Sequence, residues 1–267
     1  MKKFRLGFIG TGNIATAIIN GVITSGYIKP ECIAVFDTNS DKIIPFINSG
    51  CMFISNSAEL TKQCEFVFLT VKPQIYSIVL NEIRNFADNT CFVDVAAGVS
   101  ISAVKDLLGF DAPVIRVMPN TPLMVGSGAT AIVKQNPVTD SQFSFIKGCF
   151  DSCGITAVVE EENINTVIAA SGSSPAYIMR FANSIIDFAV SNGLNIDSAK
   201  QLVIQTLEGC AKLIKESDVE ISRLIANVTS PNGTTEAGLK SLDECNFEKV
   251  INKCLLATVK RAEELSK

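Results

Sequence analysis

Short apolar runs alternate with amphipathic segments from the start of the chain to about residue 160. The apolar runs have the length of β-strands, which are predicted at 5–9, 33–37, 66–70, 91–95, 113–118, 129–133 and 156–159. Helices are predicted between them at 14–25, 42–49, 57–63, 74–84, 101–108 and 140–153. This α/β alternation is typical of a doubly wound, Rossmann-type and mostly parallel sheet with helices on both faces.

Beyond Glu160 the strand-like alternation stops, and apolar residues recur only at helical spacing. Helices are predicted at 163–171, 175–192, 197–215, 220–228, 234–244 and 247–265, with Asp197 as the N-cap of the third. The pattern therefore predicts an α/β domain of residues 1–161 and an all-α domain of residues 162–267. A bundle of long apolar helices often completes its core in a partner chain, so a homo-oligomer is expected.

The first predicted strand runs into Gly10-x-Gly12-x-x-Ala15, after which a helix is predicted. The first glycine permits a tight turn, the second lets a pyrophosphate approach the backbone, and the small third residue lets the helix pack on the strand. The helix start then offers free N–H groups, beginning at Asn13 and Ile14. Asp37 ends the second strand about 20 residues later, where a carboxylate can bind a ribose hydroxyl. The motif predicts a bound dinucleotide.

Loops after the next strands are candidates for the same site, because ligands lie beyond the carboxyl ends of parallel strands. Asn120 follows the fifth strand, and its amide can reach the nicotinamide amide or simply satisfy its own turn. Lys72 can meet a phosphate or ribose, or it can be a solvated loop lysine. The small residues after the fourth strand leave room for a nicotinamide ring against the backbone. The candidates from the third and fourth strands are Val71, Lys72, Pro73, Ala96, Ala97 and Gly98.

Composition excludes several classes of function. The net charge is −4, so a nucleic-acid partner is not expected, and no apolar stretch is long enough to predict a membrane span. The nine cysteines include no Cys-x-x-Cys pair, which favours reduced thiols in a cytoplasmic protein and no metal site. The chain has no histidine, so histidine acid–base catalysis and histidine metal ligands are excluded.

A loop rich in hydroxyl groups precedes the helix predicted at 234–244. Ser230, Thr234 and Thr235 supply hydroxyls, either threonine is expected to cap the helix, and the helix start supplies free N–H groups. These groups can bind a small carboxylate without an arginine. The same loop can equally be an ordinary turn between two helices, with no role in binding.

This loop, from Val228 to Leu239, closely resembles the signature of the pyrroline-5-carboxylate reductases. Five further blocks resemble that family in the same order, beginning at Gly7, Val71, Ala96, Met118 and Ser171, so the resemblance covers essentially the whole chain. Asn232 departs from the family, which usually has glycine there. Since asparagine tolerates left-handed backbone, little damage is expected.

The resemblance implies reduction of 1-pyrroline-5-carboxylate to L-proline, the last step of proline biosynthesis. It also implies an NAD(P)H-binding domain, a helical dimerisation domain, active sites between the two, and homodimers often arranged as rings. Matched position by position, the resemblance assigns cofactor contacts to Asn56, Lys72, Ala97 and Asn227. Ser230, Gly233, Thr234 and Thr235 are assigned to the substrate carboxylate, with Thr235 also near the ring nitrogen.

The missing histidine agrees with this reaction. A cyclic imine that arrives protonated needs only a hydride, so the enzyme works mainly by positioning. Thr235 is then expected to orient the ring nitrogen without being an indispensable acid. The family commonly prefers NADP(H), whereas Asp37 favours NAD(H) by repelling a 2′-phosphate, so both cofactors stay open.

Three alternatives share the first loop. A β-hydroxyacid dehydrogenase uses a lysine in its first long interdomain helix, where this chain offers Arg180 and Asn183, and arginine does not deliver a proton at neutral pH. A methyltransferase would bind S-adenosylmethionine instead of a nicotinamide. A non-catalytic nucleotide-binding protein would not need the intact loop at Ser230–Thr235.

Overall fold

The computed structural model describes residues 2–265. The chain divides into two compact units. One unit takes in the chain up to Ser173 together with the stretch from Thr258 on, and the other spans Ser174–Ala257.

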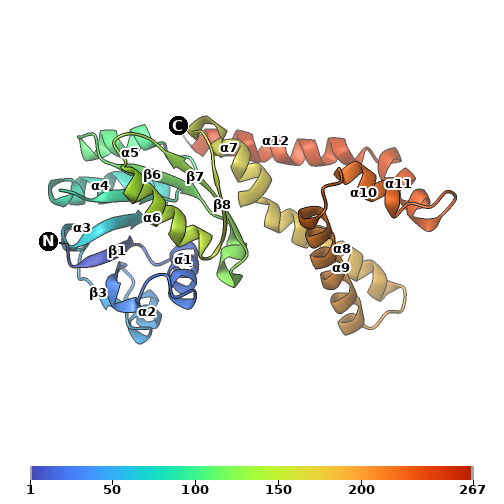
Figure 1. The fold of residues 1–267 in the computed structure, drawn as a ribbon, viewed down its shortest axis with the longest axis horizontal. Helices are drawn as coiled ribbons and strands as arrows, with labels where there is room; N and C mark the ends of the chain where they lie inside the picture. The colour runs from blue at the N-terminus through green and yellow to red at the C-terminus, as the bar shows by residue number, and fades with distance from the viewer. Residues whose placement is uncertain (1, 266–267) are drawn as a thin grey trace. The chain divides into compact units, whose positions relative to one another are not determined.

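The first unit contains an eight-stranded sheet in the order β3-β2-β1-β4-β5-β6-β7-β8 (Figure 1). Neighbouring strands are parallel except β6 and β7, which are antiparallel, so the sheet is mostly parallel as predicted. The strands are β1 (Phe4–Ile9), β2 (Ile33–Phe36), β3 (Met52–Phe53), β4 (Cys64–Leu69), β5 (Cys91–Asp94), β6 (Val114–Met118), β7 (Gly128–Lys134) and β8 (Gly154–Val158).

The sequence pattern misses one of these strands. β3 has only two residues, Met52 and Phe53, and both side chains are exposed at the edge of the sheet. A strand this short shows no alternation of buried and exposed positions, so periodicity gives no signal for it.

Helices cover both faces of the sheet (Figure 1). Short 3₁₀ turns precede several of them, which is why the predicted helices at 42–49 and 74–84 are shorter in the structure. The predicted helix at 163–171 is also interrupted, because a short α-helix passes there into a π-helical turn over Ile168–Gly172. The helices are α1 (Asn13–Thr24), α2 (Ile44–Asn48), α3 (Ser57–Gln63), α4 (Tyr76–Ile83), α5 (Ile101–Leu108), α6 (Asp140–Asp151) and α7 (Ile164–Val167).

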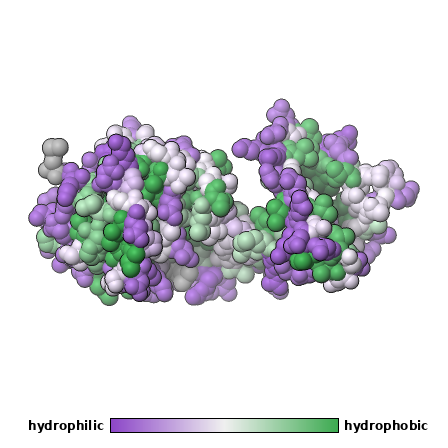
Figure 2. Space-filling model, turned by 90° about the horizontal axis from the view of Figure 1, so that it is seen from below, coloured by the Kyte–Doolittle hydropathy of each residue, from purple (hydrophilic) through white to green (hydrophobic). Residues whose placement is uncertain are grey.

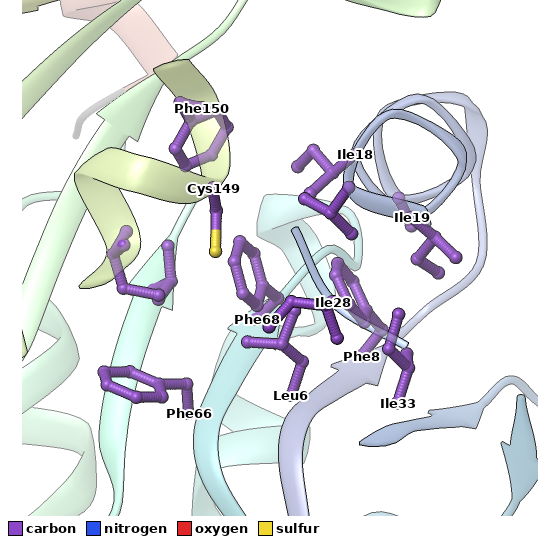
Figure 3. Close-up of a cluster of buried hydrophobic side chains, with 14 of the residues drawn as sticks. Leu6, Phe8, Ile18, Ile19, Ile28, Ile33, Phe66, Phe68, Cys149 and Phe150 are labelled. Atoms are coloured by element: carbon purple, nitrogen blue, oxygen red, sulfur yellow. The ribbon is translucent and has the colours of Figure 1, made fainter. Parts of the chain in front are cut away.

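Alternate side chains of the strands point to opposite faces of the sheet and belong to two separate hydrophobic cores. Figure 3 shows the first core, where α1 and α6 pack on β1 and β4 through side chains such as Ile18 and Phe150. The rings of Phe8 and Phe68 stack there with centroids 4.4 Å apart, an arrangement worth about 0.5–1.5 kcal/mol beyond burial. The second core holds side chains of α3, α4, α5 and α7, for example Leu80. The sheet is thus packed on both faces, and the loops at its edge leave from buried strands.

The second unit is made of helices only. They are α8 (Ser174–Ser191), α9 (Ile196–Glu216), α10 (Ile221–Asn227), α11 (Thr234–Glu244) and the first part of α12 (Phe247–Leu265). Asn195, not Asp197, caps α9, because the Asn195 side chain accepts a hydrogen bond of 2.8 Å from the Asp197 N–H. The predicted N-cap was therefore wrong by two residues.

Much apolar surface of the second unit faces outward, and apolar patches are visible on it in Figure 2. Of its residues, all of which the structure describes, only Ala199 and Val203 are buried. Phe188 and Leu202 are 69% and 60% exposed although they lie on long amphipathic helices. A unit with so small a core of its own needs a covering surface.

No helix within residues 2–265 combines the length and apolar character needed to cross a membrane.

Candidate functional site

The turn from β1 into α1 uses its two glycines for different reasons. Gly10 has a φ of +96°, and a Cβ there would lie 2.8 Å from the Thr70 carbonyl oxygen, so only glycine fits beside β4. Gly12 stands at the N-cap of α1, and of the residues that the structure describes, none beyond its two chain neighbours comes within 4 Å of where its Cβ would be. A ligand can therefore approach this backbone closely. The N–H groups of Asn13 and Ile14, in the first turn of α1, have no acceptor within the helix.

A cavity of about 520 Å³ opens at the carboxyl ends of β1, β2 and β4. Thr38 and Lys42 provide polar groups on the β2 side, while Ile75 and Val79 provide an apolar wall. This size and mixture fit the nucleotide part of a dinucleotide. Five residues expected from the sequence line the cavity, namely Gly10, Gly12, Asp37, Val71 and Lys72.

The Asp37 carboxylate faces the glycine turn. One of its oxygens accepts hydrogen bonds from the Thr11 N–H (2.7 Å) and the Thr11 hydroxyl (3.0 Å). The other oxygen accepts the Asn39 N–H at 2.9 Å. Burial alone would raise the pKa of Asp37, but these hydrogen bonds and the Lys42 charge together hold that pKa below its ordinary value. Asp37 is therefore ionised at neutral pH and braces the turn, with lone pairs left for one ribose hydroxyl.

Nine of the fourteen expected cofactor residues are not among the described residues that line this cavity, and four of them are Asn13, Ile14, Asn56 and Pro73. Asn56 caps α3, because its side-chain oxygen accepts the Glu59 N–H at 2.8 Å. Pro73 begins the 3₁₀ turn that follows Lys72. Both residues thus have a structural role that is independent of any ligand.

The loop after β5 holds three expected residues, Ala96, Ala97 and Gly98. β5 lies next to β4 in the sheet and runs parallel to it, so this loop leaves the same edge as the cavity. Gly98 has a φ of +84°, which lets the chain turn away there. The Ala96 N–H donates a hydrogen bond of 3.0 Å to a carboxylate oxygen of Asp94.

The Asn120 side chain forms hydrogen bonds with other parts of the first unit. Its side-chain oxygen accepts the Ala129 N–H at 2.9 Å, and its amide nitrogen donates to the Ser171 carbonyl oxygen at 3.3 Å. The side chain is buried. These partners lie 9 and 51 residues away, so the Asn120 side chain links distant segments and does not cap the 3₁₀ turn that follows it.

The hydroxyl-rich loop lies in the second unit, between α10, which ends at Asn227, and α11. Gly233 is fixed by crowding, because a Cβ there would lie 2.9 Å from the Ser230 carbonyl oxygen and would also collide with the Ser230 hydroxyl. Asn232 has a φ of +58°, so asparagine does adopt the left-handed backbone expected of it. Its N–H donates a 2.8 Å hydrogen bond to the Glu236 carboxylate.

The predicted cap of α11 was wrong. Gly233 occupies the N-cap with extended backbone, and no side chain caps the helix. Thr234 and Thr235 fall instead in the first turn of α11, where their N–H groups have no acceptor within the helix. The loop thus offers hydroxyls and unsatisfied N–H groups at a helix start, the arrangement that binds small anions.

Comparison with known proteins agrees with both halves of this description. Residues 161–265 match the family model for pyrroline-5-carboxylate reductase dimerisation, and residues 5–98 match the model for NADP oxidoreductase, coenzyme F420-dependent. The pyrroline-5-carboxylate reductase of Corynebacterium melassecola is 34% identical over 98% of each chain, and that of Escherichia coli is 33% identical over 100% of each. The chain belongs to the pyrroline-5-carboxylate reductase family.

A crystal structure gives the same result at the level of the fold. The Plasmodium falciparum pyrroline carboxylate reductase with NADP bound is 29% identical, covers 100% of both chains and superposes with a TM-score of 0.93. As a family member, the chain is an NAD(P)H-dependent oxidoreductase with a dimerisation region. The hydroxyacid dehydrogenase alternative also lacks its lysine, since α8 carries none.

Some residues that line the cavity, or that support the residues around it, were missed by the sequence analysis. Thr11 stands in a variable position of the glycine motif, and only the structure shows that it binds Asp37. Ile75, Ile78 and Val79 form the apolar wall, but in the sequence they look like an ordinary amphipathic helix start. Asp94 carried one signal, an acidic residue at the end of an apolar strand.

Proposed function

We propose that this chain reduces the C=N bond of 1-pyrroline-5-carboxylate to give L-proline, with NADPH as the main hydride donor and NADH as a second one. The observation that carries the proposal is the loop Ser230–Thr235, which presents hydroxyls and free N–H groups at the start of α11. The other unit holds a cavity of a size and lining that fit a dinucleotide, which also supports the proposal. Residues 1–161 would serve as the cofactor domain and residues 162–267 as the substrate and dimerisation domain.

The cofactor roles follow from the position of each group. Gly12 and the N-terminus of α1 would hold the pyrophosphate, since the backbone is open there and carries the positive end of the helix dipole. Asp37 would accept a ribose hydroxyl, and Lys72 would meet a phosphate or ribose. The small loop after β5 would lie against the nicotinamide ring. The proposed cofactor residues are Gly10, Gly12, Asn13, Ile14, Asp37, Asn56, Val71, Lys72, Pro73, Ala96, Ala97, Gly98, Asn120 and Asn227.

The substrate roles belong to the second unit. Ser230, Thr234 and the N–H groups that follow Gly233 would bind the substrate carboxylate, helped by the dipole of α11. Thr235 would place its hydroxyl beside the ring nitrogen. The reduced nicotinamide supplies a hydride when it is bound. The residues of the chain would then only bind, orient and shield, because a protonated imine needs no further acid and the product amine takes its later proton from water.

Preference between the two cofactors depends on Asp37. Its ionised carboxylate would repel a 2′-phosphate, but its charge is partly satisfied by Thr11 and Asn39. Thr38 and Lys42 stand on the same wall of the cavity and can bind that phosphate. This balance supports NADPH with NADH as a slower substitute.

We also propose a homodimer formed through the second unit, with further assembly into rings of dimers. The exposed apolar side chains of α8 and α9 support this, because a second copy would cover them. The cytoplasm is the proposed location, where the thiols of the nine cysteines stay reduced.

The test is the loss of reduced-nicotinamide absorbance with pyrroline-5-carboxylate, measured separately with NADPH and NADH. Turnover with NADPH, and slower turnover with NADH, is expected. Lack of turnover with both, in protein that binds NADPH, would refute the proposed reaction.

A further inference from the structure

Three polar side chains are buried below the loop after β5. Asp94 ends β5, Arg116 lies on the neighbouring β6, and Tyr76 begins α4. Asp94 is 0% exposed and Arg116 only 5% exposed. A buried aspartate is costly unless its charge and lone pairs are satisfied, so its presence here needs a reason.

One oxygen of Asp94 collects most of the contacts. It accepts the Ala96 N–H at 3.0 Å and lies 2.6 Å from the Tyr76 hydroxyl. The same hydroxyl lies 2.8 Å from the Leu69 carbonyl oxygen. Burial, together with the Asp94 charge, raises the pKa of Tyr76 well above its ordinary value, so the tyrosine keeps its one proton. That proton can serve only one of the two oxygens at a time.

The other oxygen of Asp94 is poorly satisfied. It lies 4.0 Å from the Arg116 Nε, and both atoms lack a hydrogen-bond partner among the described residues. The Arg116 guanidinium is held elsewhere, because its Nη1 donates a 3.0 Å hydrogen bond to Glu161. Glu161 in turn accepts the Ile101 N–H at 2.8 Å. The Asp94 carboxylate and the Arg116 guanidinium have opposite charges, so they attract each other at 4.0 Å without forming a hydrogen bond.

We propose that Asp94 is a positioning residue for hydride transfer, which holds the Ala96–Gly98 loop through the Ala96 N–H while Tyr76 and Arg116 hold its carboxylate. This inference rests on the proposed reductase function, in which that loop carries the nicotinamide ring. Asp94 is 0% exposed, so in this proposal it acts through the Ala96 N–H and not by touching substrate or cofactor.

Because Asp94 can be charged or neutral, its hold on the Ala96–Gly98 loop depends on pH. Burial raises the pKa of Asp94 to about 6, against the opposing effects of the Tyr76 and Ala96 hydrogen bonds and the Arg116 charge, while the Glu161 charge raises it further. Above that pH the carboxylate is ionised, attracts Arg116 and accepts both hydrogen bonds. Below it, a protonated Asp94 donates to the Tyr76 hydroxyl, whose own proton then goes to Leu69. The hydrogen bond from the Ala96 N–H to Asp94 is weaker when Asp94 is neutral.

The test compares wild type with Asp94→Asn across the pH range. Asparagine keeps the shape and one acceptor for Ala96 but cannot become negative. The ratio of wild-type to variant kcat is measured at each pH, because the titration of substrate and cofactor is common to both proteins and cancels. We expect a ratio of about ten at pH ~8, falling to within about twofold at pH ~5 with a midpoint near pH 6, since small displacements of reacting groups cost one to two orders of magnitude in rate. KM for NADPH stays within about twofold, because the glycine turn is untouched.

Ile146→Val is the matched control for loss of core stability, since Ile146 is fully buried in the other core, on α6. Its ratio to wild type is expected to be constant with pH. A ratio for Asp94→Asn that is also constant with pH, whether near one or far from it, would overturn the proposal. Inactive wild type would instead point to failure of the proposed reaction.

Tyr76→Phe keeps the test decisive if Asp94→Asn does not fold. Removing the hydroxyl takes away a bond that lowers the pKa of Asp94, so Asp94 protonates at a higher pH in this variant. The ratio of wild-type to variant kcat is then expected to peak just above pH ~6 and to fall on either side. A ratio without such a peak would contradict the proposal.

Discussion

Replacing Gly233 by alanine tests the substrate loop most sharply. The backbone φ of Gly233 is −86°, so alanine is not excluded by backbone strain. Its Cβ would, however, lie 2.9 Å from the Ser230 carbonyl oxygen and closer still to the Ser230 hydroxyl. Ordinary van der Waals contact begins near 3.4 Å, so the loop must move by about half an ångström.

This movement is expected to weaken the hydrogen bonds between the loop and the substrate carboxylate. A hydrogen bond to a charged group is worth about 1.5–3 kcal/mol. Loss of one such bond raises KM for pyrroline-5-carboxylate by about 10- to 150-fold. KM for NADPH is expected to stay within about twofold, because the Gly233 loop and the dinucleotide cavity belong to different units of the chain. Steady-state kinetics with each substrate varied in turn measures both values.

Gly238→Ala is the matched control for this experiment. Gly238 lies within the same helix, α11, and among the described residues nothing beyond the adjacent helix backbone comes within 4 Å of where its Cβ would be. Alanine at this position stabilises the helix by about 1 kcal/mol relative to glycine. Both KM values are expected to stay unchanged. An unchanged KM for pyrroline-5-carboxylate in Gly233→Ala, or an equal effect of the two variants, would refute the role given to the loop.

Two further changes test the other assigned roles. Thr235→Ala is expected to lower kcat/KM by about 10- to 100-fold while leaving measurable turnover, since positioning does not require an indispensable acid; complete loss of activity in protein that still binds both ligands would make Thr235 the acid. Asp37→Asn removes the charge but keeps an acceptor for Thr11, so the ratio of kcat/KM for NADPH to that for NADH is expected to rise about tenfold. An unchanged ratio would mean that Asp37 does not govern cofactor choice.

The sequence predicts the sheet well because its strands are buried. β1, β4 and β5 are mainly apolar, with one charged residue each (Arg5, Glu65 and Asp94). Gly10 and Gly12 stand where β1 meets α1. β3 leaves no such trace, since it has two exposed residues and is recognised only by its pairing with β2.

The details of the site depend on contacts between residues far apart in sequence. Asp37 was expected to face a ribose, but its bonds to Thr11 across 26 residues are a property of the fold. Gly233 and not Thr234 occupies the N-cap of α11, and a Cβ on Gly233 would collide with Ser230, a contact that propensity alone does not reveal. The burial of Asp94 beside Arg116 likewise appears only when β5 and β6 pair.

The most direct test of the account follows the hydride itself. NADPH that carries deuterium on the transferred position of the nicotinamide is incubated with the enzyme and pyrroline-5-carboxylate, and the proline formed is analysed by mass spectrometry and NMR. The account predicts one deuterium in proline, on the ring carbon of the former C=N bond. Proline without deuterium, or no proline while the cofactor is bound, would contradict direct hydride transfer to the imine.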